Sequence, residues 1–95
     1  MIVEWSQQAA DDLASLRTYI AEDDPAAAQR IVLHIIHCIE DLLAGQPPMG
    51  RPGRVPGTRE LVVPRTSYIV PYRIRDNRVQ VVRVYHGARK WPDKL

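Results

Sequence analysis

The side chains that could do chemistry gather in the last third of the chain, between Thr58 and Trp91. Arginine offers a planar fork of donors that suits carboxylates, phosphates and base edges. His86 adds a ring whose unperturbed pKa lies near physiological pH, so it can serve as a general acid or base. The arginines of interest here are Arg59, Arg73, Arg83 and Arg89. These residue types favour binding of an anionic partner.

The charge of the chain is divided between its two halves. The net charge is only +2, but residues 1–50 hold two arginines against eight acids, whereas residues 51–95 hold eleven lysines and arginines against three acids. A basic half of this kind could face nucleic acid or an acidic protein. The alternative is that the arginines only keep a solvated sheet face soluble.

Three runs of β-branched and aromatic residues predict the strands that carry these side chains. They span Thr58–Val63, Tyr68–Arg75 and Arg78–His86. Asp76 and Asn77 separate the last two and tolerate positive φ, as a type I′ hairpin turn requires. Pro71 falls inside the middle run, where a missing amide removes a ladder bond, so we expect a bulge or local break there.

The first half predicts a short strand, Met1–Trp5, and two amphipathic helices. Ser6 is a plausible N-cap, and Leu13, Leu16 and Ile20 recur at helical spacing up to about Ala21. A second helix begins at Asp24-Pro25 and runs to about Ala44, with Val32, Ile35 and Ile39 on its apolar stripe. The link between the helices is short, so they should form an antiparallel hairpin.

The stretch Gly45–Gly57 is rich in Gly and Pro and is expected to be neither helix nor strand. His34 and His37 lie one turn apart, but Arg30 and Asp41 continue the same polar stripe. A solvated helix face explains this pattern, so we expect no metal site and no cofactor.

These elements predict one α+β domain covering residues 1–95, with the order β-α-α-β-β-β. The expected architecture is a small antiparallel sheet with a helical hairpin packed on one face. The single cysteine, Cys38, excludes an intramolecular disulfide and favours a reducing, cytoplasmic setting. The start of the chain lacks the pattern of a signal peptide, and no apolar run approaches the ~20 residues that cross a bilayer.

Taken together, the motifs resemble those of the RelE/ParE superfamily of toxins from bacterial toxin–antitoxin modules. The resemblance covers nearly the whole chain and lies in the order of short segments, not in any single one. The segments are Val3-Glu4-Trp5-Ser6, Ala10-Asp11-Asp12-Leu13, Pro25-Ala26-Ala27-Ala28, Gly50-Arg51-Pro52-Gly53-Arg54, Gly57-Thr58-Arg59-Glu60-Leu61, Tyr68-Ile69-Val70-Pro71-Tyr72-Arg73 and Arg83-Val84-Tyr85-His86-Gly87-Ala88-Arg89.

The resemblance implies a toxin that a small cognate antitoxin neutralises by wrapping its surface. RelE-like members cut messenger RNA in the ribosomal A site, whereas ParE-like members poison DNA gyrase. If this chain is a nuclease, Arg59, Arg83 and His86 are its catalytic candidates. Cleavage through the 2′-hydroxyl also needs a second acid or base. The chain has no carboxylate between Asp41 and Glu60, no lysine before Lys90, and Tyr68 where several nucleases carry arginine.

The nuclease set is therefore incomplete, and we favour the ParE-like branch with DNA gyrase as target. The ribosome with its messenger RNA is the alternative target, and a non-toxic basic binding module remains a third possibility. In the ParE-like interpretation, residues around the sheet hold the antitoxin or gyrase and perform no chemistry. The residues expected to bind a partner are Arg59, Tyr68, Arg73, Arg83, Arg89 and Trp91.

Overall fold

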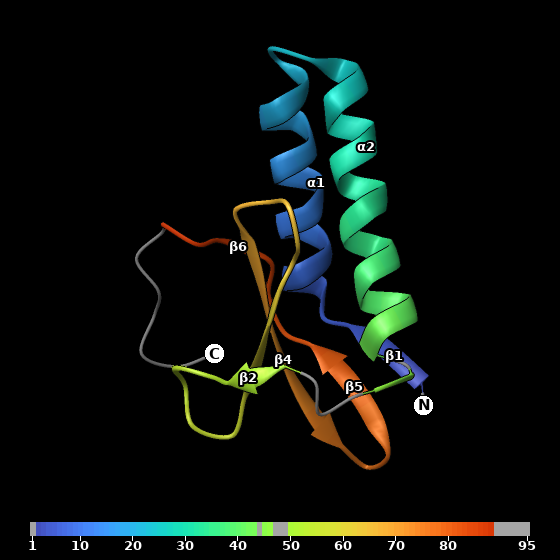
Figure 1. Ribbon diagram of the computed structural model, residues 1–95, viewed down its shortest axis with the longest axis vertical. Coiled ribbons are helices and arrows are strands. Elements are labelled where there is room, and N and C mark those ends of the chain that lie inside the picture. Colours follow the sequence, from blue (N-terminus) through green and yellow to red (C-terminus); the bar gives the residue numbers. More distant parts are fainter. Residues whose placement is uncertain (1, 44, 47–49, 89–95) are drawn as a thin grey trace.

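The computed structural model describes residues 2–43, 45–46 and 50–88, except for the side chains of residues 42 and 43. It contains a two-helix layer and a mixed sheet (Figure 1). The α+β class and the helical hairpin on one face of the sheet are as predicted. Arg89 and Trp91, both predicted to bind a partner, lie outside the described residues.

Both helices begin at the predicted caps. In α1 (Gln7–Ala21) the Ser6 hydroxyl accepts from the Ala9 amide at 2.9 Å. In α2 (Pro25–His37) a carboxylate oxygen of Asp24 accepts from the Ala27 amide at 3.0 Å. Each cap satisfies an amide that has no partner within its helix. The second helix was predicted to run to about Ala44: α2 ends at His37, and the helix continues to Leu43 as the π-helical segment Cys38–Leu43 (η1).

The sheet has the order β1-β5-β4-β3-β2, and β6 pairs with β4. The strands are β1 (Ile2–Trp5), β2 (Arg51–Pro52), β3 (Arg59–Val62), β4 (Tyr68–Arg75), β5 (Arg78–Val81) and β6 (Tyr85–His86). The predicted antiparallel meander is present in β3, β4 and β5, but the sheet as a whole is mixed, because β1 runs parallel to β5. Because β3 and β5 occupy the two edges of β4, β1 pairs with the free edge of β5. The long connection between β1 and β5 permits this pairing to be parallel.

The predicted strand Arg78–His86 is divided by a bulge opposite Pro71. The bulge lies between the pairs Tyr72–Val81 and Ile69–Tyr85. Between these pairs, β4 has two residues, 70 and 71, whereas the partner has three, 82–84. The Val82 amide donates to the Pro71 carbonyl at 2.9 Å. Because the N and C=O of one strand residue point to the same side, the missing Pro71 amide faces the bulge. β4 itself is continuous through Pro71, so the irregularity lies in its partner.

The expectation that Gly45–Gly57 contains no strand is also wrong. Arg51 and Pro52 pair with Glu60 and Arg59 at the edge of the sheet. Pro is tolerated on an edge strand because its missing amide costs no bond on the open side. Side-chain bonds from Glu60 and Tyr72, described below, hold this segment in place.

The core lies between the helical hairpin and one face of the sheet. Leu16, Ile35 and Ile39 are buried there against Val70, Tyr72 and Val81. Leu13, Ile20 and Val32 are partly buried and pack against the same cluster, so the predicted apolar stripes are confirmed. Full burial of one such aliphatic side chain contributes about 1.5–3 kcal/mol.

The β4–β5 turn has the backbone that Asp76 and Asn77 predict, with φ of 53° and 61°. Both central residues of a type I′ turn have positive φ. The turn lies at the opposite end of the molecule from the α1–α2 link (Figure 1). Three of the arginines, Arg73, Arg75 and Arg78, belong to this hairpin.

Candidate functional site

Arg83, a predicted catalytic and partner-binding residue, is held by α1. Its Nε and Nη2 donate to the two carboxylate oxygens of Asp12 at 2.7 and 2.9 Å. The same carboxylate accepts from the Val84 amide at 3.0 Å. Hydrogen bonding to Asp12 raises the pKa of Arg83, outweighing the effect of its burial. The guanidinium also lies 4.7 Å from the centre of the Tyr85 ring.

His86 and Tyr68 lie side by side on β6 and β4. Their rings meet edge to face with centroids 5.6 Å apart. The Ala88 amide donates to Nδ1 of His86 at 3.2 Å, which leaves the proton of the neutral ring on Nε2. Burial, with a smaller contribution from Tyr19, raises the pKa of Tyr68. Tyr68 is therefore a hydrogen-bond donor near neutral pH and not a base.

An open pocket of about 600 Å³ lies between α1 and these two strands. Asp12, Leu16, Tyr19, Tyr68 and His86 are among the residues that line it. The structure thus brings together three of the predicted site residues. His86 and Tyr68 line the pocket, and Arg83 is bound to Asp12, which also lines it. His86 is exposed and able to exchange protons with a ligand placed there.

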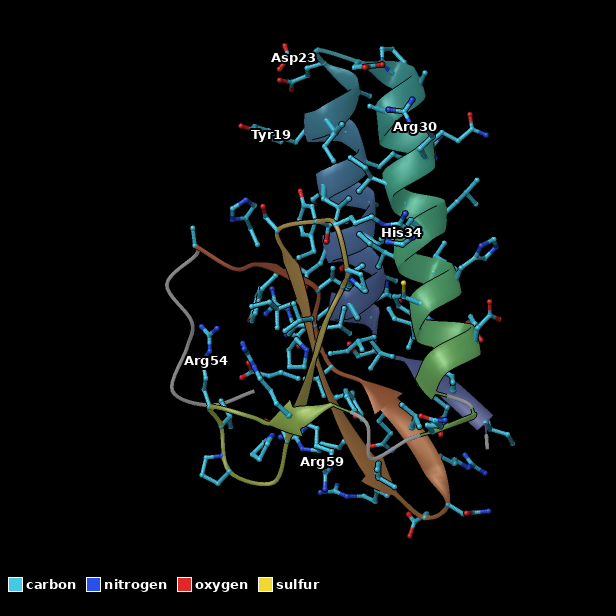
Figure 2. The ribbon with its side chains drawn as sticks, in the orientation of Figure 1. Tyr19, Asp23, Arg30, His34, Arg54 and Arg59 are labelled. Carbon is cyan, nitrogen blue, oxygen red and sulfur yellow. The ribbon has the colours of Figure 1, made fainter. Side chains whose placement is uncertain are left out.

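Arg59 lies far from this pocket. It pairs with Tyr72 on β4, whereas His86 pairs with Tyr68 on the opposite edge of the same strand. Four residues of strand separate these two positions, a distance of about 13 Å. Arg59 Nη1 donates to the Gly50 carbonyl at 2.9 Å. Figure 2 shows Arg59 near β2, while Tyr19 projects from α1 at the other end of the molecule.

Glu60 organises the arginines around β2 and is only 2% exposed. One carboxylate oxygen accepts from Arg51 at 3.0 Å, and the other accepts from the Arg54 amide at 2.8 Å. The Tyr72 hydroxyl accepts from the Gly50 amide at 2.8 Å. A Cβ on Gly50 would collide with Tyr72, so this approach requires glycine. Glu60, the one carboxylate in the three predicted strands between Thr58 and His86, is thus used within the fold.

Arg73 lies elsewhere again, on the sheet face away from the helices. It lines a small pocket of about 340 Å³ with Glu4, Gln80 and others. The predicted set Arg59, Tyr68, Arg73 and Arg83 is therefore spread over three regions of the sheet and does not form one cluster.

His34 is less solvated than its polar stripe predicts. Its Nε2 donates to the Pro64 carbonyl at 2.8 Å, which ties α2 to the β3–β4 connection. Across residues 2–43, 45–46 and 50–88, no three His, Cys, Asp or Glu side chains are grouped so that they could hold a metal ion. Within the same residues, no helix is both long and apolar enough to cross a membrane.

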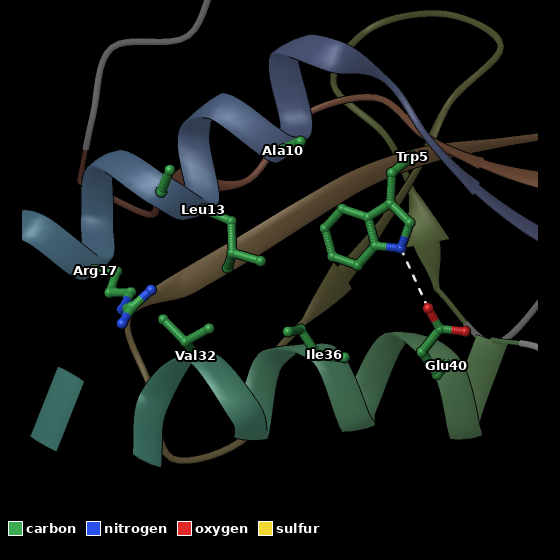
Figure 3. Close-up of a pocket in the computed structure, with 8 residues that line it drawn as sticks. Trp5, Ala10, Leu13, Arg17, Val32, Ile36 and Glu40 are labelled. Carbon is green, nitrogen blue, oxygen red and sulfur yellow. Dashed lines mark hydrogen bonds between the residues drawn. The ribbon is translucent and has the colours of Figure 1, made fainter. Parts of the chain in front are cut away.

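A groove between the helices is a site that the sequence did not single out. It has a volume of about 420 Å³ and is lined by Trp5 together with residues of α1, α2 and η1. Figure 3 shows Leu13, Val32 and Ile36 between Arg17 at one end and Glu40 at the other. Trp5 Nε1 donates to Glu40 at 3.3 Å. The small side chains of Ala10 and Ala14 leave room beside Leu13. In the sequence, these two alanines are the feature that could have indicated a groove.

The chemistry available at the pocket is limited. Among the described residues that line it, His86 is exposed, Tyr68 keeps its proton, and Asp12 is bound to Arg83. Phosphodiester cleavage needs an acid and a base on opposite sides of the reacting phosphate, with cations beside it. The arrangement provides His86, a tyrosine whose raised pKa makes it a weak acid, and a cation already paired with a carboxylate. It is better suited to binding than to catalysis.

Comparison with known proteins agrees with this fold. The family model described as "ParE toxin of type II toxin-antitoxin system, parDE" matches residues 3–91. The chain is 42% identical to "Putative toxin Y4kP" of Sinorhizobium fredii, over 98% of this chain and 95% of that protein. It is 37% identical to "Toxin RelE2" of Caulobacter vibrioides, over 92% of this chain and 96% of that protein.

Two solved structures are similar over 90% of this chain and 95% of their own, each at 28% identity. One is from the chromosomal ParDE toxin–antitoxin system of Pseudomonas aeruginosa, with a TM-score of 0.80. The other is from the RelBE2 toxin–antitoxin complex of Mycobacterium tuberculosis, with a TM-score of 0.66. With the family match and the two close relatives, these likenesses establish that the chain belongs to the ParE toxin family of type II toxin–antitoxin systems.

Proposed function

We propose that this toxin stops growth by poisoning DNA gyrase and that it is not a nuclease. The observation that carries the proposal is the pairing of Arg83 with Asp12. A nuclease would need that guanidinium to stabilise the phosphorane charge, but its Nε and Nη2 already donate to the Asp12 carboxylate. The described lining group beside His86 is Tyr68, and its raised pKa makes it a weak general acid near neutral pH.

The structural likeness supports the same branch. At equal sequence identity, the fold lies nearer to the ParDE toxin than to the RelBE2 complex, with TM-scores of 0.80 and 0.66. A gyrase poison needs a binding surface and no catalytic constellation. Arginines dispersed over the sheet fit that requirement.

The second candidate is a RelE-type, ribosome-dependent endoribonuclease. Two observations favour it: one close relative is named "Toxin RelE2", and His86 lies at a pocket large enough for a nucleotide. In that case His86 would transfer the proton, and a substrate phosphate would have to draw Arg83 from Asp12. Arg59 would play no part at that pocket, because it lies at the other end of the sheet.

We place the cognate antitoxin, which would neutralise the toxin, in the groove between the two helices. Its apolar floor is open to a partner, and Arg17 stands at one end. An antitoxin segment with apolar residues on one side and an acid near Arg17 would fill it. Interfaces commonly combine an apolar core with arginine anchors.

Controlled expression in a bacterial host tests the target. A gyrase poison should block DNA synthesis first, with double-strand breaks, and protein synthesis should fail only later. Immediate loss of protein synthesis with intact DNA would contradict the proposal and favour the nuclease. Normal growth in the absence of the antitoxin would leave a non-toxic binding module as the better account.

A further inference from the structure

The groove between the helices carries opposite charges at its two ends. Arg17 of α1 lies at one end and Glu40 of η1 at the other, with an apolar floor between them (Figure 3). Both residues are exposed. Within the part of the chain that the structure describes, Arg17 makes no ion pair or hydrogen bond through its side chain, and Glu40 accepts only from Trp5 Nε1, at 3.3 Å. The contacts within the fold therefore leave the charge at each end of the groove available to a partner.

The residues that line the groove form two stripes along the helix axes. On each helix they recur at intervals of three or four residues, and residues at this spacing share one face. The stripes are Ala10, Leu13, Ala14 and Arg17 on α1, with Val32, Ile36 and Glu40 on α2 and η1. Each stripe covers about two helical turns, or about 10 Å along the axis.

A groove of this kind fits a helix better than an extended segment. An extended peptide gains affinity by pairing its backbone with the edge of a sheet. The groove is walled by α1, α2 and η1, whose backbone groups bond within each helix, so an extended peptide would leave its own amides unpaired there. A helix satisfies its own backbone and presents side chains at positions i, i+3, i+4 and i+7. The room beside Ala10 and Ala14 lets such a helix approach closely.

We propose that Arg17 and Glu40 select the antitoxin by charge, and that the segment bound between them is a helix with an acid facing Arg17 and a base facing Glu40. This inference rests on the antitoxin site proposed above. The partner is an antitoxin because the chain belongs to a toxin family of toxin–antitoxin systems. Since the groove covers about two turns, the acid and the base of the bound helix stand seven or eight positions apart, with apolar residues midway between them.

The two charges act on selection more than on affinity. The floor of Leu13, Val32 and Ile36 can accept many amphipathic helices of suitable size, so it does not by itself distinguish one antitoxin from another. An exposed ion pair adds little to affinity, whereas like charges brought together oppose binding strongly. A helix with acids at both positions, or with bases at both, meets a like charge at one end of the groove in either orientation.

The test is isothermal titration of the full chain with its cognate antitoxin at about 150 mM salt, where exposed charges more than about 8 Å apart are largely screened. Arg17→Glu and Glu40→Arg should each weaken binding at least ~10-fold, because each brings like charges together. Arg17→Gln only removes an attraction and should weaken binding by no more than about 5-fold. The matched control is Asp41→Arg, at an exposed position next to Glu40 but outside the groove lining, which should change the affinity by less than about 2-fold.

Exchange of charges across the interface identifies the facing groups. Each acid of the antitoxin is replaced by Lys in turn, and one of these variants should bind the Arg17→Glu toxin more tightly than it binds the parent toxin. In the same way, one antitoxin base replaced by Glu should prefer the Glu40→Arg toxin. That base should lie seven or eight positions from the acid, as one face of a helix requires. Failure to find such a pair, or a pair at another spacing, would overturn the proposal.

The outcomes separate this proposal from the function proposed above. If Ala10→Glu weakens antitoxin binding but Arg17→Glu and Glu40→Arg do not, the groove remains the antitoxin site and selection by charge is wrong. If none of the three substitutions weakens binding, the antitoxin lies elsewhere and the proposal is also overturned. Neither result bears on the gyrase target, because the titration contains no gyrase. Circular dichroism of each variant separates a lost contact from a lost fold.

Discussion

Asp12 on α1 holds Arg83 through two parallel hydrogen bonds of 2.7 and 2.9 Å, although 71 residues separate them. The carboxylate also caps the Val84 amide inside the bulge that precedes β6. Asp12 thereby fixes the helical layer to the strand that carries His86. Both side chains are largely buried, at 14% and 20% exposed.

Removal of this carboxylate should destabilise the protein. Asp12→Ala leaves a partly buried guanidinium and the Val84 amide without their partner, which should lower the free energy of unfolding by about 1–3 kcal/mol. Urea denaturation measures the change. Asp11→Ala is the matched control, because Asp11 is exposed and should change the value by no more than about 0.5 kcal/mol. Equal effects of the two substitutions would show that the Asp12 contacts add nothing.

The helical hairpin should behave as a structural layer. Ile35 is 0% exposed and lies in the core cluster, so Ile35→Ala should cost about 2–5 kcal/mol in unfolding free energy. Leu33 on the same helix is 47% exposed, and Leu33→Ala should cost far less. An Ile35→Ala protein as stable as the parent would contradict the layer arrangement.

Alkaline pH should reveal the burial of Tyr68. Burial raises the pKa of the Tyr68 hydroxyl, so the unfolded chain releases this proton at lower pH than the folded protein does. The free energy of unfolding should therefore fall as the pH rises above about 10, the ordinary tyrosine value. Tyr68→Phe removes this group and should make that fall shallower in urea titrations. An identical slope in the variant would contradict the assignment.

A charge placed in the α1–α2 groove should block the antitoxin. Ala10 is an exposed lining residue, so Ala10→Glu adds a carboxylate without disturbing the core and should weaken antitoxin binding at least ~10-fold. Isothermal titration with the cognate antitoxin measures this. Ala26→Glu, at an exposed position of α2 outside the groove, is the control. If both variants bind as the parent does, the antitoxin lies elsewhere.

Local patterns predicted the local structure well. Ser6 and Asp24 mark the helix starts because capping is decided within three residues, and Asp76-Asn77 specify their turn through their own φ. The pairing of β1 with β5 joins residues 76 positions apart, and no local pattern encodes it. β2 was not predicted because Gly and Pro dominate its segment. It is held by contacts from another strand, among them the bond from the Arg54 amide to the buried Glu60 of β3.

The site was harder to predict for the same reason. The sequence identified Arg59, Arg83 and His86 by residue type, but it could not reveal that Asp12 binds Arg83 or that Arg59 turns toward Gly50. Their separation along β4 follows from strand register, which the bulge opposite Pro71 shifts by one residue. Residue types therefore showed which chemistry was available, and only the fold shows which groups meet.

A supercoiling assay with purified gyrase, run beside primer extension on ribosome-bound messenger RNA, tests the central claim most directly. The account predicts that the toxin inhibits supercoiling, that the antitoxin restores it, and that the messenger stays intact. His86→Ala should still inhibit supercoiling, at most with a weaker affinity, because inhibition in this account needs no acid or base at His86. Messenger cleavage at A-site codons that is lost in His86→Ala, with supercoiling unaffected, would contradict it.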